Sequence, residues 1–365
     1  MALTNPIILE DVEKIAGELE PVLRALSGTT LLVTGGSGFL CSYFLDTIAY
    51  LNDHAWARPC HMICVDNLKS GHAQRITHLL TREDFRFIEA DISRPVNEIS
   101  QVDWIIHGAS IASPTFYRLH PLETINVNVD GTRQMLELAR QHEVRSMLYL
   151  SSSEIYGDPE PGWIPTPETY RGSVSCTGPR ACYDESKRLA ETLCTTYHRL
   201  YGTPVKIARP FNVYGPGQRL DDGRIIPDLM HSAVHRQPIV LYSDGRATRA
   251  FCYISDAIRA MWYVLCSDAD GEVFNVGNDQ QEVSIRELAE LVRQIAGPPW
   301  LEIEHRVSRD VHYLTDNPQR RCPDLTKLRS RFPWEPKVSL TEGLWRTLRS
   351  YLEESSREHG RTSGL

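Results

Sequence analysis

The sequence lacks the features that would assign the protein to a membrane or to nucleic acid. A membrane-spanning helix needs about 20 consecutive apolar residues, and no run approaches that length. The formal net charge is −8, whereas a protein that wraps a phosphate backbone usually carries a clustered basic face. The N-terminus also lacks the basic and then apolar order of a secretory signal. We therefore expect neither a membrane nor a nucleic-acid partner.

The cysteines lack the pairing that a disulfide framework or a metal site would show. There are 9, an odd number, and none form a C-x-x-C pair. Cys60 and Cys64 lie in a strand-like apolar run, which favours thiols of the core over metal ligands. This usage is typical of a reduced protein. We expect a cytoplasmic protein without a metal.

Short apolar runs alternate with helical segments over the first 210 or so residues. Strands buried on both faces read in this way, because helices cover each side of the sheet. Thr124–His142 and Ala181–Tyr201 carry apolar residues at spacings of three and four, as crossover helices do. The pattern predicts an α/β fold, a doubly wound parallel sheet of the Rossmann type. The expected strands are Leu31–Val33, Met62–Val65, Phe85–Ile88, Trp104–Ile106, Met147–Leu150 and Val205–Ala208.

A glycine-rich turn, Thr34–Cys41, follows the first expected strand and opens a helix. Glycines there let the backbone approach a pyrophosphate, and the helix N-terminus favours its charge. Asp66 ends the second strand, where a carboxylate can accept hydrogen bonds from both ribose hydroxyls and repel a 2′-phosphate, so NAD is expected rather than NADP. Asp91, after the third strand, is placed either to meet the adenine or to cap a helix. Cys41 departs from the glycine pattern, and we expect a slightly displaced helix.

Tyr183 and Lys187 lie four apart on one expected helix and therefore point the same way. The fifth strand ends in Ser151–Glu154. An ammonium beside a phenol lowers the phenol pKa, which would let Tyr183 take a hydroxyl proton while hydride leaves the same carbon. The Ser152 hydroxyl would steady the carbonyl oxygen that forms. The set predicts alcohol oxidation with NAD.

The remaining segments are placed around this sheet. Residues 7–26 read as an amphipathic helix ending before Gly28, either an extra packing helix or a dimerisation arm within an N-terminal extension, residues 1–28. We expect the NAD-binding domain over residues 29–215 and about 250–276. A smaller C-terminal α/β substrate lobe is expected over residues 216–249 and 277–352, with a helix from Ser284 to Ile295. Residues 353–365 are polar, and we expect a frayed tail.

These motifs together resemble the NAD-dependent epimerase/dehydratase family of extended short-chain dehydrogenases. Within the family, the blocks Gly178–Arg188 and Asn317–Asp324 are most similar to those of UDP-glucuronate decarboxylases. The other matching stretches are Thr34–Leu40, Ser110–Tyr117, Ser153–Pro159, Ala208–Pro216, Asp221–Arg224 and Thr248–Phe251.

The resemblance implies a role for each matching residue. The cofactor residues would be Gly35, Gly38, Phe39, Leu40, Asp66, Asn67, Asp91, Ile92, Ala109, Ser110, Asn128, Tyr183 and Lys187. Asn212, Arg224 and Arg249 would hold the nucleotide diphosphate, and Pro114 and Tyr117 would also contact the substrate. Glu154 and Arg321 would face the sugar and, with Ser152, Tyr183 and Lys187, form the catalytic set. Arginine suits this task because its planar donors can bind two oxygens at once.

The reaction implied is oxidative decarboxylation of UDP-glucuronate to a UDP-4-keto-pentose or to UDP-xylose. A nucleotide-hexose 4,6-dehydratase is an alternative, although such enzymes have an acidic Asp-Glu pair where this chain has Ser153-Glu154. A 4-epimerase is another alternative, but it needs no glutamate and arginine aimed at C5. A UDP-apiose synthase would carry a cysteine within Ser110–Pro114, and a non-catalytic NAD sensor would be expected to lose Tyr183 or Lys187. The resemblance also implies a homodimer formed through Thr124–His142 and Ala181–Tyr201.

Overall fold

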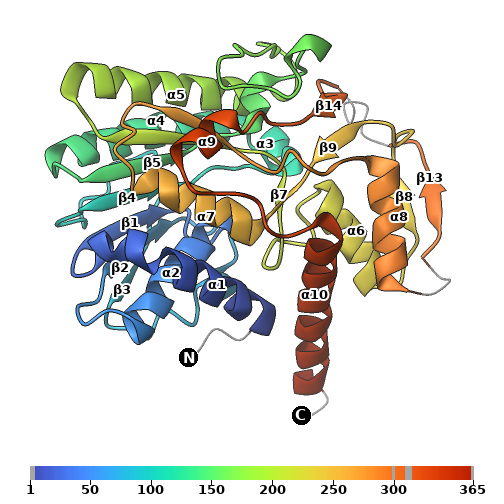
Figure 1. Ribbon diagram of the computed structural model, residues 1–365, viewed down its shortest axis with the longest axis horizontal. Coiled ribbons are helices and arrows are strands. Elements are labelled where there is room, and N and C mark those ends of the chain that lie inside the picture. Colours follow the sequence, from blue (N-terminus) through green and yellow to red (C-terminus); the bar gives the residue numbers. More distant parts are fainter. Residues whose placement is uncertain (1–4, 298–300, 309–314, 363–365) are drawn as a thin grey trace.

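The computed structural model describes residues 5–297, 301–308 and 315–362. Its centre is a seven-stranded sheet in the order β11-β6-β5-β4-β1-β2-β3, in which every neighbouring pair is parallel. The predicted doubly wound parallel sheet is confirmed (Figure 1). The strands are β1 (Thr30–Thr34), β2 (His61–Asp66), β3 (Phe85–Glu89), β4 (Trp104–His107), β5 (Ser146–Leu150), β6 (Val205–Pro210) and β11 (Val273–Val276).

Helices cover both faces of the sheet (Figure 1). Leu31 and Val33 of β1 pack into the core that contains α2 (Phe39–His54) and α7 (Ile254–Leu265). Leu32 points the other way, into the core beneath α4 (Pro121–Gln141) and α5 (Ala181–Tyr201). This alternation follows from the two-residue period of a strand.

The sequence located six of the seven strands of this sheet. Residues 181–201 form α5 with the predicted bounds, and α4 starts three residues before its predicted beginning. The strand not predicted is β11, whose four residues, Val273 to Val276, include an asparagine. Asn275 is nevertheless fully buried, because its side chain amide donates to the carbonyls of Thr166 and Asp324.

A smaller lobe stands beyond the carboxyl ends of the strands (Figure 1). Its sheet has the order β12-β9-β14, in which the parallel pair of β9 and β14 sets Arg321 opposite Arg249. The helix α8 begins with a capping box between Ser284 and Glu287. The remaining elements after β6 are β7 (Val213–Tyr214), α6 (Ile225–Val234), β8 (Ile239–Leu241), β9 (Thr248–Ala250), β10 (Cys252–Tyr253), β12 (Glu282–Ser284), α8 (Ile285–Ala296), β13 (Ile303–His305), β14 (Arg320–Arg321), α9 (Thr326–Arg331) and α10 (Leu340–Thr362). Of these, α9 packs against β11 of the large sheet, where Lys327 donates to the Val273 carbonyl.

The N-terminal helix α1 (Pro6–Leu23) packs within the chain against α2, α7 and α10. Asp11 is buried on it, accepting hydrogen bonds from Tyr253 at 2.7 Å and Arg346 at 2.8 Å. The amide of Asn5 donates to Glu354 of α10 at 2.6 Å. The expected frayed tail is therefore wrong over residues 353–362, which continue α10, because the start of this segment is held by α1; residues 363–365 lie outside the described residues.

Cys41 occupies the position in α2 where the glycine pattern leads one to expect a smaller residue. Its sulfur lies over Gly108, just after β4. A Cβ added at Gly108 would be 2.3 Å from the sulfur and 3.0 Å from Leu150. The absence of a side chain at residue 108 therefore makes room for the thiol at residue 41.

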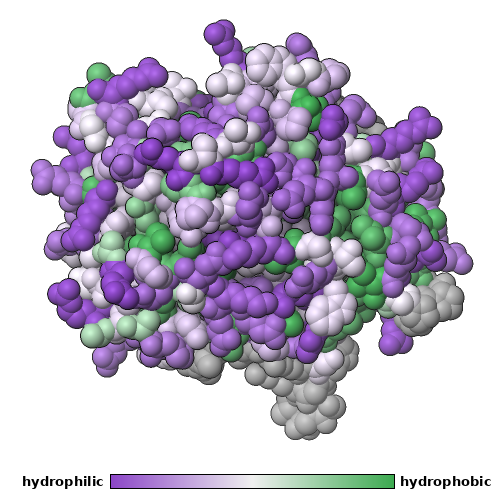
Figure 2. All heavy atoms as spheres, in the orientation of Figure 1, coloured by the Kyte–Doolittle hydropathy of each residue, from purple (hydrophilic) through white to green (hydrophobic). Residues whose placement is uncertain are grey.

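The surface is mainly polar on the face shown in Figure 2. No helix among the described residues is long and apolar enough to cross a membrane. Exposed large hydrophobic side chains gather on α3 (Pro114–Leu119), α4 and α5. They are Leu119, Leu122, Ile125, Leu189, Leu200 and Tyr201.

Candidate active site

A cleft of about 1220 Å³ lies between the carboxyl ends of the strands and the smaller lobe. This is where ligands bind in open parallel sheets. Its volume exceeds the ~300–1,000 Å³ of a usual small-molecule site, so the cleft has room for a dinucleotide and a second ligand. The predicted site residues that line it are Gly35, Gly38, Phe39, Leu40, Asp66, Asn67, Asp91, Ile92, Ala109, Ser110, Pro114, Tyr117, Ser152, Glu154, Tyr183, Lys187, Asn212, Arg224, Arg249 and Arg321.

The glycine-rich turn forms a close backbone cradle. Gly35 has φ +72°, and a Cβ there would lie 2.7 Å from the Cα of Ala109, so no other residue fits. Gly38 is the N-cap of α2 and has no side chain with which to cap the first amides. These N–H groups and the helix dipole therefore remain suited to a pyrophosphate. The turn fits an NAD-type dinucleotide.

Asp66 lines the cleft at the end of β2, as predicted, but it also orders the turn. One carboxylate oxygen accepts from the backbone N–H of Ser37 at 3.0 Å and from its hydroxyl at 2.6 Å. The other accepts from the Leu68 N–H at 2.9 Å. A carboxylate has about four acceptor positions, so three are used within the chain. Hydrogen bonds from both ribose hydroxyls, as predicted, would need two free acceptor positions on Asp66. This arrangement leaves about one.

The sequence placed Asp91 either at the adenine or at a helix cap, and the structure shows a lining position together with a capped turn. Its side chain lines the cleft. One oxygen also accepts from the N–H and the hydroxyl of Ser93, at 3.0 and 2.8 Å. The carboxylate thus caps a turn rather than a helix, while it faces the expected adenine end of the cleft.

Tyr183 and Lys187 project from the first two turns of α5, beside Ser152 at the end of β5. Burial raises the pKa of Tyr183 to about 12, although a hydrogen bond with Ser152 opposes the shift. Burial lowers the pKa of Lys187 to about 8. The Lys187 ammonium donates to the Leu150 carbonyl at 2.8 Å and lies 5.9 Å from the centre of the Tyr183 ring. The predicted lowering of the phenol pKa is therefore wrong for this structure, because burial outweighs the favourable contacts.

Tyr117 of α3 stacks on the catalytic phenol. The ring centres of Tyr117 and Tyr183 are 5.0 Å apart, with an angle of 14° between the planes. The Tyr117 hydroxyl is buried without a hydrogen-bond partner among the described residues. The ring therefore fixes the orientation of Tyr183.

Glu154 joins two arginines at the end of the cleft where the sugar is expected. It lies in a short 3₁₀ turn, η3 (Ser153–Tyr156). Arg321 binds both of its oxygens, with one bond short and the other 2.8 Å, and Arg180 makes a further short bond to the second oxygen. Burial alone would raise the pKa of Glu154, but the charges of Arg180 and Arg321 outweigh it and hold this pKa well below its ordinary value. The guanidinium groups of Arg180 and Arg321 thus share one carboxylate, that of Glu154.

Asp184 is only partly ionised near neutral pH. Burial, and then the charge of Glu154, raise the pKa of its carboxyl to about 7. The balance at this end of the cleft therefore stays positive near neutral pH, which suits an anionic ligand.

The residues expected at the diphosphate are present, but they are engaged to different degrees. Arg249 is 7% exposed, and its donors reach the carbonyls of Thr248 and Pro318 and the amide oxygen of Asn317. Arg224 is more open and pairs with Asp222 at 2.8 Å. Arg249 thus also anchors the loop that carries Arg321.

Asn128 is the predicted site residue that does not reach the cleft. It is buried in α4 and its amide donates to the Ser186 hydroxyl at 2.8 Å. Conversely, the sequence analysis gave no role to Arg180, Ser113, Asp228 or Tyr242. All four residues line the cleft. The Ser113 hydroxyl also donates to the Asp222 carbonyl at 2.6 Å. Arg180 and Ser113 had a usable signal, because they lie inside the matching stretches Gly178–Arg188 and Ser110–Tyr117.

A dinucleotide cradle and a Ser–Tyr–Lys set in one cleft define an oxidoreductase-type site of the short-chain dehydrogenase class. The chain belongs to the NAD dependent epimerase/dehydratase family, whose profile matches residues 31–277. The predicted family is confirmed, and so is NAD as the cofactor.

The chain is similar to UDP-glucuronic acid decarboxylase 1 of Arabidopsis thaliana, with 39% identity over 321 residues, 88% of this chain and 69% of the relative. UDP-glucuronic acid decarboxylase 1 of Xenopus tropicalis is 35% identical over 352 residues, 95% of this chain and 78% of the relative. Among solved structures, a dTDP-glucose 4,6-dehydratase from Streptomyces venezuelae with NAD bound has a TM-score of 0.78 at 27% identity, covering 90% of this chain and 98% of that one. A UDP-glucose 4-epimerase from Thermotoga maritima has a TM-score of 0.77 at 25% identity, covering 89% and 99%.

Proposed function

We propose that this protein is an NAD-dependent UDP-glucuronate decarboxylase. The observation that carries the proposal is the pairing of Glu154 with both Arg180 and Arg321 beside Tyr183. Two guanidinium groups with one glutamate leave a positive charge where the far end of the sugar would lie, which matches a sugar carboxylate. The curated relatives at 35–39% identity, all named UDP-glucuronic acid decarboxylases, support it.

Oxidation at C4 begins the reaction. Tyr183 takes the proton of the C4 hydroxyl, and Ser152 donates a hydrogen bond to the oxygen that becomes the carbonyl. The glycine cradle, with Gly35 and Gly38, would hold NAD, which would supply the hydride acceptor for this oxidation. Lys187, with its pKa of about 8, is largely a cation at neutral pH and contributes positive charge beside the phenol.

Decarboxylation follows from the ketone. The oxidised sugar is a β-keto acid, so the electron pair of the bond between C5 and the carboxylate can move toward the C4 oxygen as carbon dioxide leaves. Ser152 and protonated Tyr183 would stabilise the enolate oxygen by hydrogen bonds. Arg321 would orient the carboxylate before it leaves, because a guanidinium can bind both of its oxygens. A proton then returns to C5.

The charge state of Glu154 argues against the 4,6-dehydratase alternative. That reaction needs an acid for the departing 6-hydroxyl, and the arginines hold the pKa of Glu154 well below its ordinary value. The neighbouring Ser153 is buried and is a poor proton donor. A 4-epimerase would have no use for a second cation at this place.

Product analysis tests the proposal directly. Incubation with UDP-glucuronate and NAD should release carbon dioxide and yield UDP-4-keto-pentose or UDP-xylose by mass spectrometry, and the ratio shows whether the ketone is reduced before release. UDP-galacturonate as product would support an epimerase. Dehydration of UDP- or TDP-glucose without decarboxylation of UDP-glucuronate would overturn the proposal.

Replacement of Tyr183 by phenylalanine tests the role of the phenol. Tyr183→Phe should abolish C4 oxidation while NAD still binds, because only the proton acceptor is removed. With a pKa near 12, the phenolate is the minor form at neutral pH, so the wild-type oxidation rate should increase with pH. Unchanged turnover in the variant would contradict the mechanism.

We also propose that two copies of the chain associate through α4 and α5. Exposed leucine, isoleucine and tyrosine side chains gather there, including Leu122, Ile125, Leu189 and Leu200. Burial of such a surface between two copies would remove it from water. Light scattering should give the mass of a dimer, and Leu122→Glu combined with Leu200→Glu should give the monomer mass; a wild-type monomer would contradict this arrangement.

A further inference from the structure

Arg180 occupies the point where the catalytic helix begins. It is the N-cap residue of α5, and its carbonyl accepts the backbone N–H groups of Tyr183 and Asp184 at 3.0 and 3.1 Å. Its side chain lines the cleft and is 12% exposed. The turn that places Tyr183 therefore also fixes the start of the Arg180 side chain.

The Arg180 guanidinium contacts Glu154 on one side and the Tyr117 ring on the other. One nitrogen donates to the Glu154 oxygen that also accepts from Arg321 at 2.8 Å. The guanidinium carbon lies 5.9 Å from the ring centre of Tyr117, the residue stacked on Tyr183. Movement of Arg180 would thus disturb the glutamate and, through one ring, the phenol.

The donors of Arg321 are already committed. Both of its terminal nitrogens bind Glu154, and its Nε is buried without a hydrogen-bond partner among the described residues. The end-on fork formed by the two terminal nitrogens can bind a substrate carboxylate only after it releases Glu154, because the remaining donor of the side-on fork, Nε, is buried. The bond from Arg180 to Glu154 does not use those donors and can persist through the exchange.

We propose that Arg180 is a positioning residue that retains the Glu154 carboxylate beside the sugar when Arg321 changes partner to the substrate carboxylate. The inference rests on the proposed decarboxylase function. Without Arg180, two carboxylates would share one guanidinium, and their repulsion would displace Glu154 or favour its protonation. Among the charges that lower the pKa of Glu154, Arg180 has the largest effect, followed by Arg321 and Arg249.

Other ionisable groups face this cluster and must be distinguished from Glu154 in a pH profile. Asp184 follows Arg180 in α5 and has a pKa of about 7, raised by burial and by Glu154. Asp316 acts on Asp184 from the loop before β14, and Tyr117 and Tyr183 lie on the other side. Asp184→Asn should remove its own ionisation and leave the effect of Arg180 in place.

The test compares Arg180→Gln with Arg180→Lys, after carbon dioxide release by the wild type has established the proposed function. We expect Arg180→Gln to lower kcat by about 10²-fold, as a misplaced catalytic group does, while KM for UDP-glucuronate changes by less than about 3-fold. The acid limb of its kcat profile should move to higher pH, because Glu154 would take a proton more readily. Arg180→Lys should recover part of kcat and of the acid limb, since it keeps the charge but not the planar fork.

Arg329→Gln is the matched control, because Arg329 also contacts two carboxylates, Asp279 and Glu335, but lies outside the cleft. It should alter the melting temperature without changing kcat or the pH profile.

An unchanged kcat and acid limb in Arg180→Gln would overturn the inference. A KM increase of about tenfold or more at unchanged kcat would also overturn it, because Arg180 would then bind the substrate carboxylate itself. If Arg180→Gln does not fold, Arg180→Lys provides the test. A wild-type pH profile together with a tenfold higher KM in Arg180→Lys would also overturn the inference. Absence of decarboxylation by the wild type would refute the proposed function alone.

Discussion

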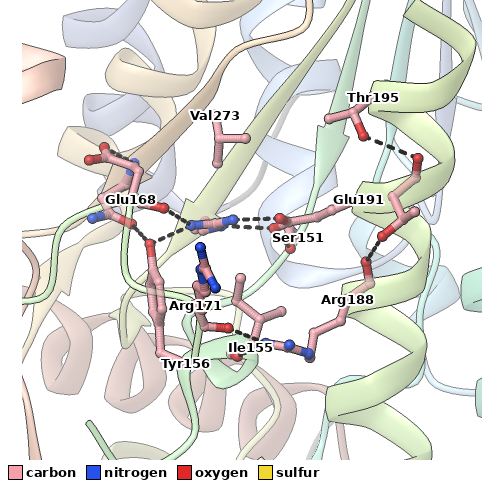
Figure 3. A network of polar contacts seen from close by, with 12 residues as sticks. Ser151, Ile155, Tyr156, Glu168, Arg171, Arg188, Glu191, Thr195 and Val273 are labelled. Atoms are coloured by element: carbon pink, nitrogen blue, oxygen red, sulfur yellow. Dashed lines mark hydrogen bonds and ion pairs between the residues drawn. The ribbon is translucent and has the colours of Figure 1, made fainter. Parts of the chain in front are cut away.

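Two glutamate–arginine pairs lie near the carboxyl end of β5, and they differ in how completely they are satisfied. Glu191 binds Arg209 through both oxygens at 2.9 and 2.6 Å (Figure 3). Ser151 donates to the glutamate at 2.5 Å, and Arg209 donates in turn to the Tyr156 hydroxyl at 2.7 Å. Glu191, Arg209 and Tyr156 lie outside the lining of the cleft, whereas Ser151 is part of that lining. In the other pair, Glu154 and Arg321 line the cleft, and the Nε atom of Arg321 is buried without a hydrogen-bond partner among the described residues. The Nε atom of the neighbouring Arg180 has only a longer ion-pair contact with Asp184, at 3.7 Å.

The difference separates a scaffold from a binding site built of the same residue types. A buried pair whose donors and acceptors are all used can only hold its elements together, here α5, β6 and the turn of Tyr156. A pair that lines a cleft can instead exchange one of its hydrogen bonds for a bond to a ligand.

The largest effect should come from breaking the complete pair. Glu191→Gln leaves Arg209 buried with one charge unpaired, and we expect the free energy of unfolding to fall by about 3–5 kcal/mol. The matched Glu154→Gln should lower it by about 1 kcal/mol or less, because the donors released can be hydrated from the cleft, and should abolish turnover instead. Denaturant unfolding of the two variants measures this, and equal losses of stability would remove the distinction.

Arg321→Ala tests the incomplete pair. It should weaken UDP-glucuronate by about 2–4 kcal/mol but leave UDP-xylose, which has no carboxylate, nearly unaffected. Arg321→Lys should restore only part of the affinity. Titration calorimetry with both ligands and a melting curve provide the measurement. Equal weakening of both ligands with a lower melting temperature would mean that Arg321 only supports the smaller lobe.

Asp11 provides a third carboxylate–arginine pair, with Arg346, far from the chemistry. Burial raises the pKa of Asp11 to about 6, above its ordinary value, so the folded state holds a proton that the unfolded state releases earlier. This contribution to stability is therefore fully present below the ordinary pKa and is lost as pH rises from about 4 to about 6, by about 2–3 kcal/mol. Asp11→Asn should remove this part of the pH dependence in urea melts, and an identical profile in the variant would refute it.

The smallest effect is expected at Asp66, which is partly engaged and partly open. NAD should bind more tightly than NADP, and Asp66→Asn should reduce the difference by about 1 kcal/mol, because the repelling charge is lost but an acceptor remains. Fluorescence titration of both cofactors measures it. Equal affinity of the wild type for NAD and NADP would show that the carboxylate does not face the 2′-position.

Periodicity predicted the sheet and its crossover helices, because the spacing of apolar residues within α5 and within each apolar strand is enough to show which residues are buried. It missed β11, whose Asn275 is satisfied by carbonyls more than 40 residues away in sequence. Motifs likewise located the cleft residues but not their partners. Nothing in the sequence shows that Lys187 reaches the Leu150 carbonyl, or that Arg180 and Arg321 converge on Glu154, since these contacts depend on how strands and loops meet in space.

The contact between Cys41 and Gly108 constrains the order in which this sequence can change. A Cβ at residue 108 would lie only 2.3 Å from the Cys41 sulfur, so alanine becomes acceptable there only after a smaller residue has replaced the cysteine. The reverse order passes through an overpacked intermediate, which typically loses 1–3 kcal/mol. The two sites are therefore epistatic, and a substitution that is harmless in one lineage would be damaging in another.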